Sequence, residues 1–261
     1  MHTSTLLDLA SAVATGGVRV IDLTFTLTPD FPVIVLPPEL AQPSPVRIQE
    51  LSRYDERGPG SYWNNITLSE HTGTHFDAPI HWYTGRNLPN NAVDTLPMRH
   101  MLAQACVIDC SAEAEADPDY LLTRERVECW EADYGAIPAG SWVLLRTDWS
   151  KKNWADYANL TADGAHTPGP GPAAIKWLVE ERGILGFGTE TIGTDAGQAS
   201  HFDPPFPAHH YLHGAGRYGL QCLCNLDLLP PRGAVIVAAP LKIWNGSGSP
   251  LRVMALVAGD R

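Results

Sequence analysis

Four side chains that can bind a metal ion or carry a proton stand within eleven residues, at His71, His75, Asp77 and His81. The chain has only ten histidines in 261 residues, so three in one short stretch are unusual. Positions 71, 75 and 77 share one parity, and alternate side chains of an extended chain point the same way. A helix would turn the carboxylate away from the histidines, and Pro79 would break it. We therefore predict an extended segment that presents the first three groups on one face and then enters a loop.

Two neutral imidazoles and one carboxylate are a typical ligand set for a catalytic divalent ion, with Mn²⁺ and Zn²⁺ the leading candidates. We predict one such ion per chain, bound by His71, His75 and Asp77. His81 lies on the same face, but Pro79 redirects the chain before it. His81 is therefore predicted to be a general base close to the ion and not a ligand. The alternative is that all four are ordinary polar residues at the end of a strand.

The rest of the chain alternates between strand-like and helical patterns. Strands are predicted at residues 18–27, 62–69, 106–110, 142–145, 184–187, 219–223, 234–239, 241–244 and 251–257. Helices are predicted at residues 5–14, 123–134 and 172–182, the second capped by Thr123 and the third starting with Pro172. Residues 28–60 are rich in proline and predict an extended excursion with some pairing. Because strands outnumber the dispersed helices, we predict an α/β protein with sheets of mixed direction.

The motif His71-Thr-Gly-Thr-His75-x-Asp77-x-Pro79-x-His81 resembles the signature of the cyclase-like metal-dependent hydrolases, a family that includes bacterial kynurenine formamidase and isatin hydrolase. Further segments resemble the family in the same order, at residues 20–24, 143–149, 188–195 and 209–226. The resemblance covers roughly residues 18–257. It implies a single domain over residues 1–261, with a β-rich sandwich or barrel-like core of the swivelling β/β/α type flanked by helices. It also implies a homodimer.

One departure from the formamidase pattern concerns the site itself. Formamidase-type members have a glutamate where this chain has Gln221. A primary amide is neutral and a much weaker ligand than a carboxylate that bridges two cations. Gln221 therefore argues against a tight second ion, and it is predicted to orient water or substrate together with His209. This pattern is similar to that of isatin hydrolases, which open the lactam ring of an indole-dione.

Aromatic residues crowd the motif and predict a pocket for a flat ring substrate. The candidate substrate-binding residues are Trp63, Trp82, Tyr83 and Phe202, with Phe206 in the same loop as Phe202, and Cys222 beside Gln221. Asp195 either supports a site residue or caps a turn, and the two alternatives are equally balanced. His201 and His210 have no assigned role, and a surface-loop position is favoured for both.

Composition excludes several classes of partner. The net charge of −11 argues against nucleic acid and anionic membranes, and no apolar run approaches the length of a membrane span. The N-terminus lacks the basic start and long apolar core of a signal peptide. The five cysteines match no paired zinc knuckle and are most simply reduced core thiols. These features predict a cytoplasmic enzyme with a small aromatic substrate.

The reaction that these residues favour is hydrolysis of a cyclic amide. The cation would activate water or polarise the carbonyl, and His81 would take the proton of the water and return it to the departing nitrogen. Isatin is the leading substrate. N-formylkynurenine and lactones would use the same groups.

Two other classes of protein compete with this interpretation. His75, Asp77 and His209 mimic the two-His-one-carboxylate triad of a non-haem iron oxygenase, but that triad leaves His71 unexplained. Oxygen consumption with iron would distinguish it from anaerobic turnover with manganese or zinc. A non-catalytic metal-binding protein is the second alternative, and the presence of His81 argues against it because a structural site needs no proton carrier.

Overall fold

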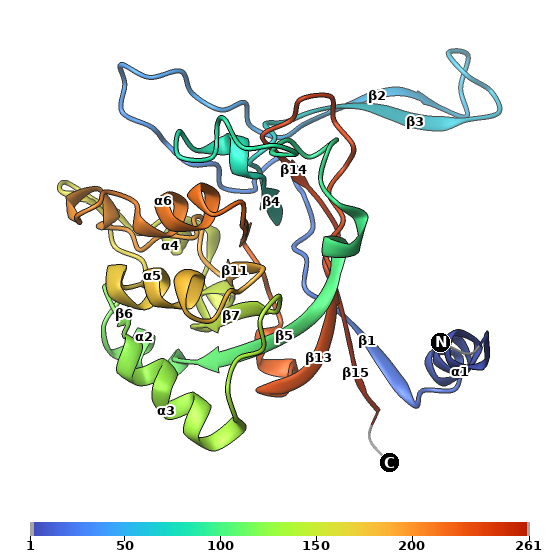
Figure 1. Ribbon diagram of the computed structural model, residues 1–261. Helices are drawn as coiled ribbons and strands as arrows, with labels where there is room; N and C mark the ends of the chain where they lie inside the picture. Colours follow the sequence, from blue (N-terminus) through green and yellow to red (C-terminus); the bar gives the residue numbers. More distant parts are fainter. Residues whose placement is uncertain (1–2, 260–261) are drawn as a thin grey trace.

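A nine-stranded, strongly curled sheet dominates the computed structural model, which describes residues 3–259 (Figure 1). Its strands, in chain order, are β1 (Val18–Asp22), β4 (His75–Asp77), β5 (Leu102–Asp109), β7 (Trp142–Arg146), β11 (Gly186–Thr189), β12 (Tyr218–Gln221), β13 (Arg232–Val237), β14 (Gly248–Pro250) and β15 (Met254–Ala258). Their spatial order is β1-β15-β13-β5-β7-β11-β12-β4-β14. The central strands β5, β7, β11 and β12 run parallel, and all other pairs are antiparallel. The predicted α/β class with mixed strand directions is confirmed.

The remaining elements connect or cover these strands. Three two-stranded sheets pair β2 (Arg47–Arg53) with β3 (Tyr62–Thr67), β6 (Leu121–Leu122) with β10 (Gly169–Pro170), and β8 (Leu160–Thr161) with β9 (Gly164–Ala165). The α-helices are α1 (Thr3–Ala14), α2 (Ser111–Ala116), α3 (Arg124–Tyr134), α4 (Trp154–Tyr157), α5 (Pro172–Glu180) and α6 (Pro207–Gly214). Short 3₁₀ turns are η1 (Pro79–His81), η2 (Met98–Met101), η3 (Trp149–Lys151), η4 (Ala199–His201) and η5 (Leu226–Leu228).

The central strands are buried on both faces, as expected of parallel strands. Along β5, Ala105 and Val107 face the core inside the curl of the sheet, whereas Cys106 and Ile108 face the core beneath the helices. Helices α3, α5 and α6 cover this second face (Figure 1). Side chains of β5 therefore alternate between the two faces of the sheet, and this one strand contributes to both cores.

The helix boundaries follow their sequence signals. The Thr123 hydroxyl accepts a hydrogen bond from the Arg126 N–H at 3.2 Å and caps α3, as predicted. Pro172 is the first residue of α5, where its missing N–H costs nothing. The predicted helix at residues 5–14 lies within α1.

Most predicted strands have other ends in the structure; the strand predicted at residues 251–257, for example, begins at Met254. Two predictions differ more. Residues 241–244 form no strand, and Trp244 is 89% exposed, because this apolar segment lies at the surface without a partner strand. The strand predicted at residues 18–27 ends at Asp22, whose carboxylate accepts the backbone N–H of Thr24 at 3.2 Å. This local bond competes with the sheet, and beyond it only the isolated bridge of Thr24 to Leu223 remains.

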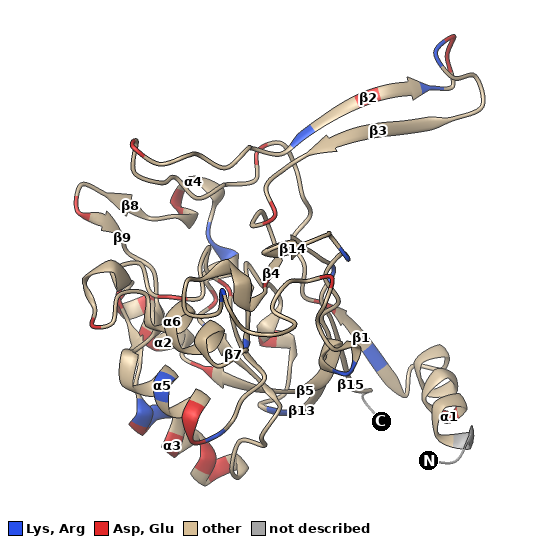
Figure 2. Cartoon of the chain, turned by 45° about the horizontal axis from the view of Figure 1, so that its top comes forward, with Lys and Arg blue, Asp and Glu red and all other residues tan. Residues whose placement is uncertain are grey.

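The β2–β3 hairpin extends away from the rest of the molecule (Figures 1 and 2). Its tip carries both signs of charge, and Arg57 pairs with Glu50 and Asp55. Its strands nevertheless expose large apolar side chains, at Ile48, Tyr62, Trp63 and Ile66.

Candidate metal and catalytic site

The sheet edge places the predicted ligands, because β4 runs between β12 and β14. His75 lies opposite Gln221 of β12, and Asp77 lies opposite Gly219 of β12 and Gly248 of β14. Residues directly opposite each other in antiparallel strands share a face. Asp77 therefore has a glycine on either side of its carboxylate, and its neighbours contribute no side chain at that level.

These two glycines make room for the site. A Cβ atom on Gly248 would lie 2.5 Å from Cε1 of His71. A Cβ atom on Gly219 would lie 3.0 Å from Nε2 of Gln221 and 3.2 Å from Oδ2 of Asp77. Any larger residue would have to displace a polar group of the site.

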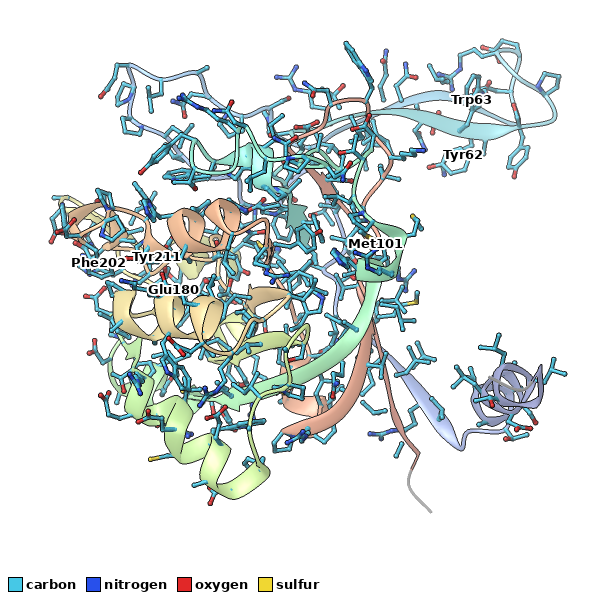
Figure 3. The ribbon with its side chains drawn as sticks, viewed as in Figure 1. Tyr62, Trp63, Met101, Glu180, Phe202 and Tyr211 are labelled. Atoms are coloured by element: carbon cyan, nitrogen blue, oxygen red, sulfur yellow. The ribbon has the colours of Figure 1, made fainter. Side chains whose placement is uncertain are left out.

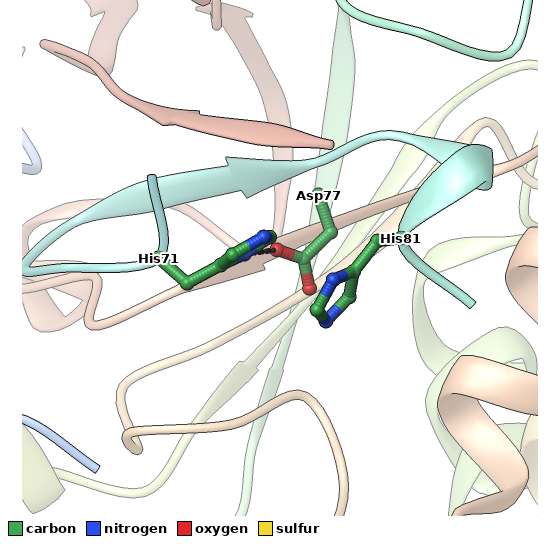
Figure 4. Close-up of side chains that lie close together, drawn as sticks. All are labelled: His71, Asp77 and His81. Carbon is green, nitrogen blue, oxygen red and sulfur yellow. Dashed lines mark hydrogen bonds and ion pairs between the residues drawn. The ribbon is translucent and has the colours of Figure 1, made fainter. Parts of the chain in front are cut away.

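Asp77 is the centre of a first cluster, shown in Figure 4. Nitrogen atoms of His71 and His81 and an oxygen of Asp77 all lie within 4.8 Å of one another. Nδ1 of His71 is 2.8 Å from Oδ1 of Asp77, and the ring centroids of His71 and His81 are 3.9 Å apart. The first turn after β4, η1, brings His81 back over the strand. The structure therefore allows His81 a ligand position as well as the predicted position of a base.

His75 approaches the same carboxylate from the strand itself. Its Nδ1 lies 2.7 Å from the carbonyl oxygen of Gly73. A carbonyl only accepts, so Nδ1 carries the hydrogen and Nε2 of the neutral ring keeps its lone pair. That Nε2 lies 3.5 Å from Oδ1 of Asp77. This tautomer, held by a backbone carbonyl, is typical of a metal-ligating histidine.

A second cluster shares Asp77 and adds two histidines from α6, His209 and His213. Nε2 of His209 lies 3.8 Å from Oδ2 of Asp77, and its Nδ1 lies 2.5 Å from Oδ2 of Asp195. Asp195 also accepts the backbone N–H groups of Ala208 and His209. It thus both caps the first turn of α6 and orients His209. Burial lowers the pKa of His209, but the hydrogen bond to Asp195 outweighs it and leaves that pKa raised.

Sequence reasoning missed His213. Its Nδ1 donates to the carbonyl oxygen of Arg217 at 3.1 Å, and its buried Nε2 has no hydrogen-bond partner. The available signal was its spacing from His209, because residues four apart lie on one helix face.

Burial favours the neutral form of three imidazoles of the site. It lowers the pKa of His81 to about 3 and the pKa values of His75 and His213 to about 4. Burial alone would raise the pKa of Asp77, yet His81 and His71 hold that pKa well below its usual value. An ionised carboxylate amid lone pairs of neutral imidazoles is a suitable environment for a divalent cation.

Gln221 lies within the site, as predicted. Its Nε2 donates a hydrogen bond to Oδ2 of Asp77, and its buried Oε1 has no partner. The amide thus occupies the place beside the shared carboxylate, where a glutamate would add a second negative charge.

The structure brings together only part of the predicted aromatic set. The centroid of the Trp82 ring lies 4.9 Å from the ring centroid of His209 and 5.5 Å from that of Phe206. Tyr83 is largely exposed and contacts His210 through its hydroxyl at 3.1 Å.

The other three predicted substrate contacts lie elsewhere. Figure 3 shows Trp63 on the projecting hairpin, and it shows Phe202 away from the hairpin. Within residues 3–259, no ring contact joins Phe202 to the cluster. Cys222 packs in a separate apolar cluster with Phe31 and Tyr157, and burial raises the pKa of its thiol to about 12. His201 is exposed, as favoured. The surface-loop position favoured for His210 is wrong, because His210 lies on α6 and is half-buried.

The comparisons with known proteins agree on one family. The family model "Putative cyclase" matches residues 21–196. The isatin hydrolase of Roseibium aggregatum is 49% identical over 257 residues, which is 97% of this chain and 97% of that protein. The family resemblance inferred from the motif is confirmed.

Two solved structures share the whole fold. Isatin hydrolase A from Labrenzia aggregata, bound to benzyl benzoate, is 59% identical with a TM-score of 0.96, and the match covers 97% of this chain and 99% of that one. An isatin hydrolase bound to the product analogue thioisatinate is 47% identical with a TM-score of 0.97, covering 99% and 100% of the two chains.

We expect about one divalent ion per chain after loading with excess Mn²⁺ or Zn²⁺, because the segment of residues 71–77 supplies one set of two imidazoles and a carboxylate. Metal analysis after gel filtration measures the ratio. His75→Ala should lose most of the bound ion, whereas His201→Ala, an exposed histidine outside the site, should keep it. Two tightly bound ions per chain would contradict the prediction and would indicate a second site at Asp77, His209 and His213.

Proposed function

Because this chain belongs to the cyclase family, we propose that it is a metal-dependent hydrolase that opens the lactam ring of isatin to give isatinate. In this reaction the hydroxyl of water joins the carbonyl carbon, the ring C–N bond breaks, and a proton goes to the nitrogen. The high identity to isatin hydrolases over nearly the whole chain supports this substrate class.

The observation that carries the proposal is a set of unpaired buried polar atoms around Asp77. Trp82 Nε1 is a donor without a partner, and Gln221 Oε1 and His213 Nε2 are acceptors without partners. Unpaired buried groups of this kind cost about 1–3 kcal/mol each, so a ligand that pairs them binds favourably. Isatin carries carbonyl acceptors and one N–H donor, so one carbonyl can accept from Trp82 and its N–H can donate to one of the two acceptors.

In the proposed reaction, the residues of the site have separate roles. A divalent cation held by His71, His75 and Asp77 would supply Lewis acidity that stabilises negative charge on the substrate oxygen. Burial lowers the pKa of His81 and leaves its ring neutral at pH 7, and we assign to this ring the proton of the attacking water. It returns that proton to the departing nitrogen. His209, oriented by Asp195, and Gln221 hold water and substrate in place.

Formamide and lactone substrates need the same groups, so specificity depends on the surroundings of Asp77. Gln221 disfavours the two-cation site that formamidase-type members build with glutamate. The rings of Trp82 and Phe206, which meet edge to face, offer aromatic contact area for a fused-ring substrate. An iron oxygenase built on His75, Asp77 and His209 would have no use for His81.

We also propose a cytoplasmic location for the protein. All five cysteines are free, and four of them are buried. Burial raises the thiol pKa of Cys110 to about 11, which keeps it protonated and unreactive. Reduced core thiols of this kind suit a reducing compartment. Among residues 3–259, no helix has the length and apolar character needed to cross a membrane.

The hairpin supports a homodimer. A two-stranded sheet is marginally stable alone, yet β2 and β3 project from the body with Trp63 59% exposed and Ile66 65% exposed. A second copy of the chain that covers these side chains would remove them from water.

His81→Ala should retain the metal and lose isatin turnover by roughly two to four orders of magnitude, the usual contribution of a general base. Metal content and kcat are measured on the same preparation. If the variant instead loses its metal, His81 is a ligand, in the position that its closeness to His71 and Asp77 permits.

The wild-type chain should hydrolyse isatin much faster than N-formylkynurenine. Gln221→Glu should slow isatin hydrolysis and increase affinity for a second ion, because a carboxylate beside Asp77 accepts hydrogen bonds but cannot donate them. Steady-state kinetics on both substrates, with metal titration of the variant, test both effects. A wild-type preference for the formamide would refute the isatin assignment and leave the hydrolase assignment standing.

Sedimentation equilibrium should give a dimer for the wild-type chain and a weakened dimer for Ile66→Lys, which places a charge on the exposed hairpin face. Trp244→Ala, which alters a fully surface-exposed aromatic outside the hairpin, serves as control and should not change the association. A monomeric wild type would refute the homodimer.

A further inference from the structure

A chain of hydrogen bonds reaches His71 from the side opposite Asp77. Nε2 of His71 lies 2.8 Å from the hydroxyl oxygen of Ser247. That hydroxyl donates to Oε2 of Glu70 at 2.7 Å, and the backbone N–H of Ser247 donates to the same oxygen at 3.1 Å. Glu70 precedes His71 in the chain, but Ser247 is 176 residues away from it.

The polarity of these bonds determines where His71 carries its hydrogen. A serine hydroxyl has one hydrogen, and the carboxylate of Glu70 takes it. The oxygen of Ser247 can then only accept, so Nε2 of His71 must donate. In the neutral ring, the lone pair is therefore on Nδ1, which lies 2.8 Å from Oδ1 of Asp77. Two acceptors at this separation need a proton or a cation between them.

We propose that Glu70 and Ser247 are positioning residues that fix the metal-binding tautomer of His71, so that Nδ1 faces the ion and Nε2–H is directed away. The proposal rests on the proposed function only in requiring that the site binds a divalent ion. Neither residue touches the substrate or the reacting atoms. Their effect is on the geometry and basicity of a ligand.

We call the hydrogen-bonded chain Glu70–Ser247–His71 the relay. The sheet holds it in place, which argues against a chance surface contact. The carbonyl oxygen of Ser247 accepts the N–H of Ala78 at 2.9 Å, directly after β4. The next residue, Gly248, pairs with Asp77 in the strand register. Both backbone polar groups of Ser247 are thus fixed, one by Glu70 and one by β4. The close approach of Gly248 to His71 leaves the ring little freedom to turn.

A purely structural role is the competing explanation, because Glu70 also ties the start of β14 to the loop before β4. That role predicts a loss of thermal stability with unchanged metal affinity. The relay predicts the reverse pattern: weaker metal binding and an altered position of the ring hydrogen in a protein that stays folded.

The experiment measures Zn²⁺ affinity by competition with a chelator of known affinity. Ser247→Ala should weaken the affinity roughly 10–100-fold, as is usual when the hydrogen-bond partner of a ligand is lost. Ser247→Thr keeps the hydroxyl and should restore most of it. Glu70→Gln should also weaken binding, because an amide can donate to Ser247 and release the serine hydrogen toward His71. Ser249→Ala is the matched control, since its hydroxyl is buried on β14 but bonds the backbone of Pro250 and Leu241.

Nitrogen-15 NMR of the histidine rings in the Zn²⁺-loaded protein gives the second readout. The wild type should show His71 protonated on Nε2 and bound through Nδ1. A His71 bound through Nε2, or a Ser247→Ala protein with wild-type affinity, would overturn the relay. A wild-type protein that binds no divalent ion would overturn the metal site as well. A protein whose Zn²⁺ affinity depends on Ser247 but that leaves isatin intact would refute the substrate and keep the relay.

Discussion

The site depends on one buried charge. Asp77 is 1% exposed and ionised, and a carboxylate in such a place is tolerated only when charges or strong hydrogen bonds compensate it. Burial favours the neutral form of the His75 and His81 imidazoles, and Gln221 contributes one amide hydrogen bond. Removal of any one partner leaves a charge without compensation, so the strand pairing, the two facing glycines and the start of α6 all have to be correct together.

The two oxygens of Asp77 face different parts of the molecule. Oδ1 faces His71 and His75, which come from the same short segment, and Oδ2 faces Gln221 and His209, which come from β12 and α6. One carboxylate thus joins the locally encoded half of the site to the half supplied by distant segments. This division separates the metal ligands from the groups proposed to orient water and substrate.

The same division explains how much could be predicted from the sequence. The spacing of His71, His75 and Asp77 and the cap at Thr123 are local patterns, and the structure agrees with the helix start. The extended segment predicted from His71 onward is correct only for His75–Asp77, because the chain turns between His71 and His75, where Gly73 has a φ of 67°. Ser247 carries no such signal, because its role depends on a strand register that brings together residues far apart in the chain. Trp63 was grouped with the motif by its closeness in sequence, yet the hairpin carries it outward. The packing that places Phe206 and not Phe202 beside Trp82 depends on the left-handed backbone at Phe206 where α6 begins.

The shortness of β14, at the edge of the sheet, and of its neighbour β4 has a thermodynamic consequence. β4 and β14 have three residues each, too few for their backbone hydrogen bonds alone to resist fraying. An ion that binds only when this edge is formed shifts the opening equilibrium of the edge by mass action. Ion occupancy and amide protection against solvent exchange in β4 and β14 are then two measures of one equilibrium. Removal of the ion by a chelator would then first lower amide protection in β4 and β14, well before the central parallel strands open.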